Sequence, residues 1–95
     1  MPAYIVFTRE KTRNQVEYDE YKSSVRATLV GHSAKLLALG GNYEVLEGAA
    51  TEGVFLMEFP SYDEAAAWYS SPAYRALSVH RWESSDHRCV IFEGV

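Results

Sequence analysis

The stretch from residue 58 to residue 77 constrains the fold of this chain more than any other. An apolar run ends at Pro60, because proline cannot donate a hydrogen bond to a sheet. Ser61 and Glu64 then have the spacing of a capping box, which begins a helix. Ser71-Pro72 is a preferred N-cap and first residue of another helix. The stretch therefore predicts a strand end followed by two short helices, at residues 62–69 and 72–82.

Periodicity and turn residues predict the remaining elements. Asn14 and Glu17 have N-cap spacing, and an apolar stripe that includes Tyr18 and Tyr21 predicts a helix from Gln15 to about Gly31. We expect strands at Ala3–Thr8, Lys35–Leu39, Tyr43–Leu46 (a side hairpin), Val54–Phe59 and Arg88–Glu93, with loops at 9–13 and 84–86. The order predicts one α+β domain over residues 1–95. It has the ferredoxin-like βαββαβ plan, a four-stranded antiparallel sheet with its helices on one face.

Both faces of the predicted sheet are apolar. In the strand at residues 54–59, one face carries Phe55, Met57 and Phe59, and the other carries Val54, Leu56 and Glu58. A sheet with one wet face should alternate apolar and polar residues, and helices can cover only one face here. The simplest cover for the second face is another copy of the chain. The pattern therefore predicts a homodimer whose two sheets pack face to face.

Composition and charge exclude several classes of function. The formal net charge of −4 and the scattered Lys and Arg disfavour a nucleic-acid or anionic-membrane surface. No segment approaches the roughly 20 apolar residues of a membrane span. Cys89 is the only cysteine, so no internal disulfide can form, and a reducing compartment such as the cytoplasm is expected. The N-terminal residues are typical of a first strand rather than a signal peptide.

Motifs along the whole chain resemble a bacterial family known as domain of unknown function 1330. The most specific is Ala67-Trp68-Tyr69-x-Ser71-Pro72-x-Tyr74. The others are Met1-Pro2-Ala3-Tyr4, Tyr18-x-x-Tyr21, His32, Gly40-Gly41, Val45-Leu46-Glu47-Gly48, Glu58-Phe59-Pro60-Ser61, Arg81 and Glu93-Gly94-Val95. The chain departs from the family at Ser33-Ala34, where Gly-Gly is common, and at Asn14-Gln15, where Asp-Pro is common.

The resemblance implies a dimeric α/β barrel with a cleft between helices and sheet. Related barrels include cofactor-free monooxygenases, haem-degrading enzymes and small-ring isomerases. Carrying those activities to this chain would rest on analogy between folds.

Two polar residues are candidates for catalysis. His32 lies at the expected end of the first helix, where it either has a structural role or serves as a general acid or base or anchors a ligand. Glu58 lies near the end of an apolar strand and faces the expected dimer interior, where Arg81 and Arg88 are its candidate partners; the alternative is a general base or a ligand contact. The remaining histidines lack metal-ligand spacing, and His87 is expected at the surface.

Aromatic residues around the junction of the last two helices are candidates for ligand binding. Trp68, Tyr69 and Tyr74 either pack in the core or line a pocket. The first functional hypothesis is a small-molecule-binding protein or cofactor-free enzyme, monooxygenase- or isomerase-like, with neither metal nor cofactor. Its predicted site is a cleft of roughly 300 Å³ or more, formed by His32, Glu58, Trp68, Tyr69, Tyr74 and Arg81. The alternative is a non-catalytic dimer module in which these side chains are structural.

Overall fold

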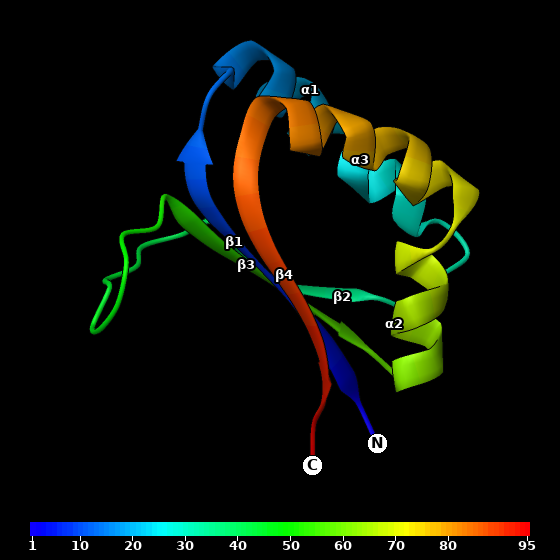
Figure 1. Cartoon of the computed structure of the whole chain (residues 1–95). Coiled ribbons are helices and arrows are strands. Elements are labelled where there is room, and N and C mark those ends of the chain that lie inside the picture. The colour runs from blue at the N-terminus through cyan, green and yellow to red at the C-terminus, as the bar shows by residue number, and fades with distance from the viewer.

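A computed structural model describes all residues from 1 to 95. Four strands form one antiparallel sheet in the order β2-β3-β1-β4. The strands are β1 (Ala3–Thr12), β2 (Lys35–Leu39), β3 (Gly53–Phe59) and β4 (Ser85–Glu93). The helices are α1 (Gln15–Ser24), the 3₁₀ helix η1 (Val25–Leu29), α2 (Tyr62–Tyr69) and α3 (Pro72–Ser84). All helices lie on one side of the sheet (Figure 1), which confirms the predicted α+β, ferredoxin-like fold.

The predicted helix starts are confirmed by their capping contacts. Asn14 Oδ1 accepts a hydrogen bond from the backbone N–H of Glu17 at 3.1 Å. Ser61 Oγ accepts from the N–H of Glu64 at 3.2 Å. Ser71 Oγ does the same at α3, which begins with Pro72. Each cap satisfies a backbone donor that the helix itself leaves free, so local sequence determines where each helix begins.

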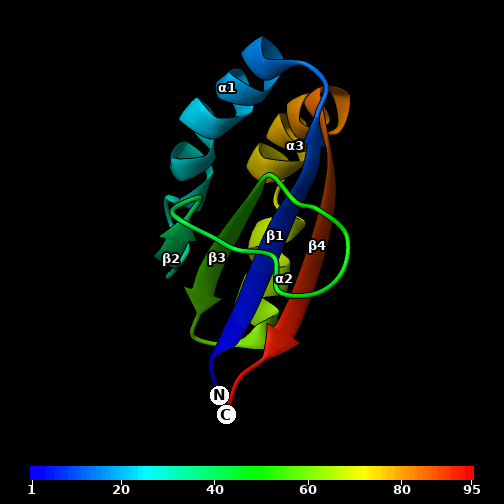
Figure 2. The ribbon, with the colours of Figure 1, turned by 90° about the vertical axis from the view of Figure 1, so that its left-hand side faces the viewer.

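The two faces of the sheet are also as the strand patterns predict. Phe59 and Ile5 of neighbouring strands are buried beneath the helices. The core cluster comprises Ala3, Ile5, Phe7, Tyr18, Tyr21, Met57, Phe59, Ala65, Trp68 and Tyr74. The opposite face, which we call the outer face, carries Tyr4, Val6, Val54, Leu56, Glu58, Val90 and Phe92, all of them partly or largely exposed. No helix covers it in this single chain (Figure 2).

The first helix is shorter than predicted. The α-helical part ends at Ser24 and continues as the tighter η1 to Leu29, two residues before Gly31. Val25 is β-branched, and the Thr28 hydroxyl donates to the Val25 carbonyl at 2.6 Å. A side-chain bond of this kind competes with the regular helical ladder. The connection then turns at Gly31, whose φ of 85° favours glycine.

The predicted hairpin strand at residues 43–46 does not form. Residues 40–52 make a loop without regular structure that projects from the uncovered side of the sheet (Figures 1 and 2). A returning strand could pair only with the free edge of β2, and a two-stranded extension that packs against nothing is only marginally stable. Leu46 has no such face, since it is 84% exposed.

The expected loops at 9–13 and 84–86 are largely strand. β1 continues to Thr12 because it pairs with β4 as far as the Thr12–Ser85 pair, across a bulge between Arg9 and Lys11. α3 passes directly into β4 at Ser84 and Ser85. The Ser84 carbonyl accepts the N–H groups of Arg13 and Asn14, at 2.7 and 3.0 Å. These long-range pairings extend both strands beyond what their polar residues predict.

Candidate functional site

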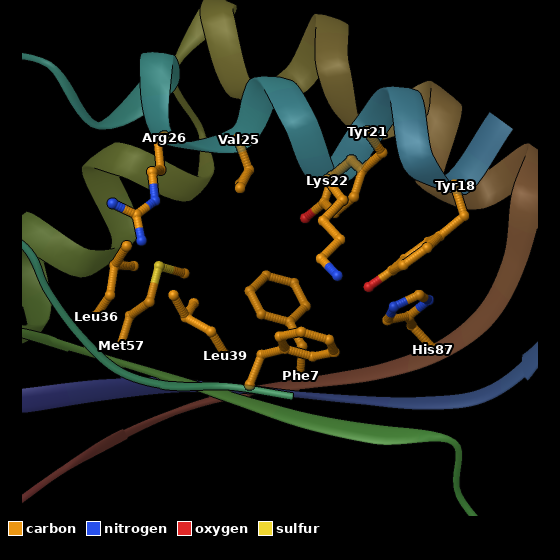
Figure 3. A pocket seen from close by; sticks show the side chains of 11 residues that line it. Phe7, Tyr18, Tyr21, Lys22, Val25, Arg26, Leu36, Leu39, Met57 and His87 are labelled. Carbon is orange, nitrogen blue, oxygen red and sulfur yellow. The ribbon is translucent and has the colours of Figure 1, made fainter. Parts of the chain in front are cut away.

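A pocket of about 210 Å³ lies between α1 and the sheet, and we call it the α1 pocket (Figure 3). Strands β1, β2 and β3 provide an apolar floor of Phe7, Leu36, Leu39, Phe55 and Met57. Helices α1 and η1 form the roof with Tyr18, Tyr21, Lys22, Val25 and Arg26, and His87 of β4 closes one end. Eight of the 11 lining residues are hydrophobic, so a ligand here would be desolvated.

The pocket exists because the roof residues do not reach the floor. Val25 has a short side chain, which ends well above the strands in Figure 3. Tyr21 directs its hydroxyl to Tyr74 of α3, at 2.8 Å. The Tyr21 ring therefore fills the space between the helices and not the space below α1.

Positive charge dominates the polar part of the α1 pocket. The side chains of Lys22 and Arg26 extend from the roof toward the floor (Figure 3). Arg9 stacks on the Tyr18 ring, with its guanidinium carbon 4.3 Å from the ring centroid. No carboxylate lines the pocket. The electrostatic field therefore favours an electron-rich or anionic group inside it.

His87 is the most perturbed base of the pocket. Burial, followed by the cationic Arg81 and Arg9, lowers its pKa to about 4. Its ring stacks on Tyr18 with centroids 5.8 Å apart, and its Nδ1 lies 3.0 Å from the Ser85 hydroxyl. The imidazole is therefore neutral at pH 7 and offers one donor and one acceptor.

The buried tyrosines beside the pocket also stay neutral. Burial raises the pKa of Tyr74 to about 12 and raises that of Tyr21 further above its ordinary value. Their hydroxyls therefore remain hydrogen-bonding groups and do not ionise near neutral pH.

A second, more open hollow of about 390 Å³ lies between α3 and β4, and we call it the α3 hollow. Its lining residues are Arg13, Tyr69, Arg81, Trp82, Ser85, Asp86, His87 and Cys89. Arg81 is only 4% exposed, and its guanidinium lies 5.2 Å from the Phe7 ring centroid. Burial raises the pKa of the Cys89 thiol to about 11, so this thiol is a poor nucleophile. His87 contributes to both cavities.

The structure brings two of the predicted ligand-binding residues together. Tyr69 and Arg81 both line the α3 hollow. Trp68 and Tyr74 are instead 0% and 1% exposed and line neither cavity. Trp68 Nε1 donates a hydrogen bond to Thr28 Oγ1 at 3.0 Å. The ring centroids of Trp68 and Tyr74 lie 4.1 Å apart. Their surroundings are those of core residues.

Glu58 lies on the outer face, as predicted, but its partner differs from the prediction. The Tyr4 hydroxyl donates to Glu58 Oε1 at 3.3 Å, and Lys35 is its register neighbour on β2. The expected pairing with Arg81 or Arg88 is wrong. Arg81 lies under the helices on the other side of the sheet. Arg88 pairs with Thr8 of β1, whereas Glu58 pairs with Tyr4, four positions away along the same strand.

His32 lies where the helix signals predict, just beyond η1. Its backbone N–H donates to the Leu29 carbonyl at 2.9 Å, and its side chain is half-buried. It lines neither cavity and lies apart from Tyr69 and Arg81 in the fold. The six predicted residues therefore do not converge on one cleft.

Sequence reasoning missed Lys22, Arg26 and His87 as pocket residues. The expectation that His87 is a surface residue is wrong, because β4 begins at Ser85 and its inward face includes positions 85, 87, 89 and 91. Strand alternation counted back from Cys89 could have found it. Nothing in the sequence marked Lys22 and Arg26 as pocket residues, because long cationic side chains beside an apolar helical stripe usually lie in solvent.

No three His, Cys, Asp or Glu side chains lie close enough together to hold a metal ion. No helix has the length and apolar composition needed to span a bilayer.

The chain belongs to the family described as domain of unknown function (DUF1330), whose model matches residues 2–95. The resemblance seen in the Trp-Tyr-x-Ser-Pro-x-Tyr motif is thereby confirmed. A search of curated protein sequences gives no significant match.

Solved structures share the fold at low sequence identity. A protein of unknown function from Rhodopseudomonas palustris is 19% identical, with a TM-score of 0.74 over 99% of this chain and 82% of that chain. A dimeric ferredoxin-like protein of unknown function from Bacteroides fragilis is 14% identical, with a TM-score of 0.69 over 98% and 96%. SnoaB, a cofactor-independent oxygenase from Streptomyces nogalater, is 9% identical, with a TM-score of 0.60 over 99% and 92%. These likenesses show a common fold.

Proposed function

We propose that the chain binds a small, ring-containing organic anion in the α1 pocket. The observation that carries this proposal is a partly open apolar pocket whose lining includes one lysine, Lys22, and one arginine, Arg26, but no carboxylate. Its volume of about 210 Å³ somewhat exceeds that of engineered cavities of about 150 Å³ that bind benzene. One or two fused rings therefore fit.

The polar groups indicate how such a ligand would be oriented. Lys22 and Arg26 attract a carboxylate or phenolate from the roof side. The Tyr18 and His87 side chains stand at the end of the pocket away from Arg26 (Figure 3) and offer hydrogen bonds to a second polar substituent. The aromatic floor contacts the face of the ring.

Binding is better supported than a base-catalysed reaction. A general base works best when its pKa is close to the working pH, and that of His87 is lowered to about 4. A cofactor-free enzyme of the monooxygenase or isomerase kind remains part of the proposal only if the substrate carries its own acidic proton. The roles of His32 and Glu58 as catalytic groups receive no support from the α1 pocket, because neither lines it.

Binding of 1-naphthoate and its neutral analogue 1-naphthalenemethanol tests the proposal by calorimetry and NMR. We expect Val25→Phe to abolish binding of both, because the added ring fills the pocket. The double variant Lys22→Gln/Arg26→Gln should lower the affinity for naphthoate by about tenfold or more and leave the affinity for the alcohol unchanged. The matched control Lys11→Gln/Arg75→Gln, at exposed positions outside the pocket, should leave both unchanged. Undiminished binding to Val25→Phe would contradict the site.

We also propose that two copies pair through the outer face. Val90 and Phe92 are 45% and 42% exposed there, and Phe92 stacks on Tyr4 with ring centroids 5.4 Å apart. Burying such a face removes apolar area from water, and a standard interface buries roughly 800 Å² per partner. The ferredoxin-like neighbour from B. fragilis is described as dimeric, which supports this proposal. A cytoplasmic location is part of the same proposal.

Sedimentation at micromolar concentration tests the dimer. The wild-type chain should sediment as a dimer, and Val90→Lys should sediment as a monomer because its charge would be buried against the partner. Val79→Lys is the matched control, since Val79 is 41% exposed on α3. A monomeric wild type would refute the pairing. If the dimer forms but no small anion binds in the α1 pocket, the alternative of a non-catalytic dimer module is favoured.

A further inference from the structure

We propose that the α3 hollow is a second binding site, which accepts the carboxylate of a small organic acid on the side chain of Arg81. This site shares only His87, which is neutral at pH 7, with the α1 pocket, and the two differ in every charged residue that lines them. The proposal therefore stands or falls independently of the function proposed above.

Arg81 is a buried cation without a counter-ion. It is 4% exposed, and neither ion pair of the chain includes it. Its Nε is fully buried and has no hydrogen-bond partner. Its neighbours are the Phe7 ring and the phenols of Tyr74, Tyr21 and Tyr69. Aromatic rings stabilise a guanidinium only partly, and a buried charge without an anionic partner is costly.

The other charges of the hollow leave this cation uncompensated. Arg13 Nε pairs with Asp86 at 3.2 Å, so these two charges offset each other. The remaining guanidinium nitrogens of Arg13 donate to the carbonyls of Glu83 and Trp82. His87 is neutral at pH 7. The hollow therefore carries one net positive charge, which belongs to Arg81.

The shape and polarity of the hollow favour a carboxylate over a phosphate. A guanidinium presents parallel N–H groups that match the two oxygens of a carboxylate. Asp86 stands at the rim and would repel a dianion more strongly than a monoanion. Tyr69 and Trp82 provide aromatic walls beside Arg81, suited to the organic part of a small acid. A carboxylate at Arg81 would supply the counter-ion that this buried guanidinium lacks.

Side-chain NMR of the intact chain tests this site directly. The Nε–H resonance of Arg81 is observed while acetate, benzoate, phosphate or chloride is added at constant ionic strength. We expect acetate and benzoate to shift the signal downfield with saturation, because Nε–H or its neighbouring N–H groups acquire an acceptor. Phosphate should bind more weakly than either acid. An unmoved signal, or an equal and linear response to chloride, would overturn the proposal.

Two substitutions sharpen the test. Arg81→Lys keeps the charge but removes the paired donors, so we expect the affinity for benzoate to fall by about tenfold or more. Binding to this variant is measured from the backbone NMR signals of Ser85 and Cys89, which line the hollow. Arg75→Gln, an exposed arginine of the same helix, should leave the affinity unchanged. Undiminished affinity in Arg81→Lys overturns the assignment. If Arg81→Lys does not fold, the wild-type Nε–H titration decides alone.

Discussion

The part of the sheet that packs against Trp68 and Tyr74, which we call the solid half, differs from the part that borders the α1 pocket, which we call the hollow half. Beneath α2 and α3, Trp68 and Tyr74 fill the space to 0% and 1% exposure. Beneath α1, the same sheet face borders a pocket of about 210 Å³. In the solid half, rings of the sheet and of the helices meet, as Phe7 and Trp68 do, whereas the roof of the hollow half adds the short Val25 and the long Lys22 and Arg26 side chains to Tyr18 and Tyr21. The difference separates packed rings that stabilise the fold from the open space of the α1 pocket.

Trp68→Ala should have the largest effect on stability. Trp68 contacts Phe7, Phe59 and Tyr74, and its loss would leave a large cavity in the solid half. We expect the free energy of unfolding to fall by about 3–5 kcal/mol in urea titrations. Naphthoate binding to the remaining folded fraction should persist, because Trp68 does not line the α1 pocket.

Trp82→Ala is the matched control for that substitution. Trp82 is 54% exposed, so its loss should change the free energy of unfolding by less than about 1 kcal/mol. Equal losses from the two tryptophans would contradict the division into a solid and a hollow half.

The solid half was largely predictable from the sequence, for local reasons. The capping residues Asn14, Ser61 and Ser71 act within one turn of chain, so their function can be read from spacing alone. Strand alternation likewise predicted which face holds Phe59 and which holds Glu58. The errors lie where distant segments decide. The long β1–β4 pairing extends both strands, and the absent hairpin at 43–46 has no surface to pack on.

The hollow half was not predictable, because a cavity is a sum over side chains from distant elements. Tyr21 was expected on the buried stripe of the first helix, and it is buried. The Tyr21 hydroxyl turns toward Tyr74 and so leaves space above Met57. This orientation depends on how α1 packs against α3, which the sequence does not show. The family motif also drew attention to Trp68 and Tyr74, whose environment in the structure is the core.

Tyr74→Phe tests the contact that joins the two halves. Removing this hydroxyl leaves the Tyr21 hydroxyl buried without its partner, at a cost of about 1–2 kcal/mol in the free energy of unfolding. The double variant Tyr21→Phe/Tyr74→Phe should recover part of that loss, since no orphaned hydroxyl remains. Additive losses in this cycle would show that the two hydroxyls do not act as a pair.

The smallest expected effect concerns the ion pair that ties the roof of the hollow half to α3. His80 Nδ1 contacts Glu17 Oε1 of α1, and this hydrogen bond, more than the nearby Glu20 and Glu83, raises the pKa of His80 in the folded chain. A raised pKa means that the folded state binds the proton more tightly than the unfolded state. The contribution is therefore fully present below about pH 6.5, the ordinary pKa of histidine, and is lost as pH rises through the folded pKa.

Urea titrations of wild type and His80→Ala across this range measure the effect. The two proteins should differ most near pH 6 and converge at alkaline pH, by a small amount because both side chains are partly exposed. Glu17→Gln should reproduce the same pH dependence, since it removes the other member of the pair. Because the tie holds α1 over the pocket, naphthoate affinity should also fall slightly in both variants at pH 6. A difference that grows as the pH rises would contradict the assigned pair and the sign of its pKa shift.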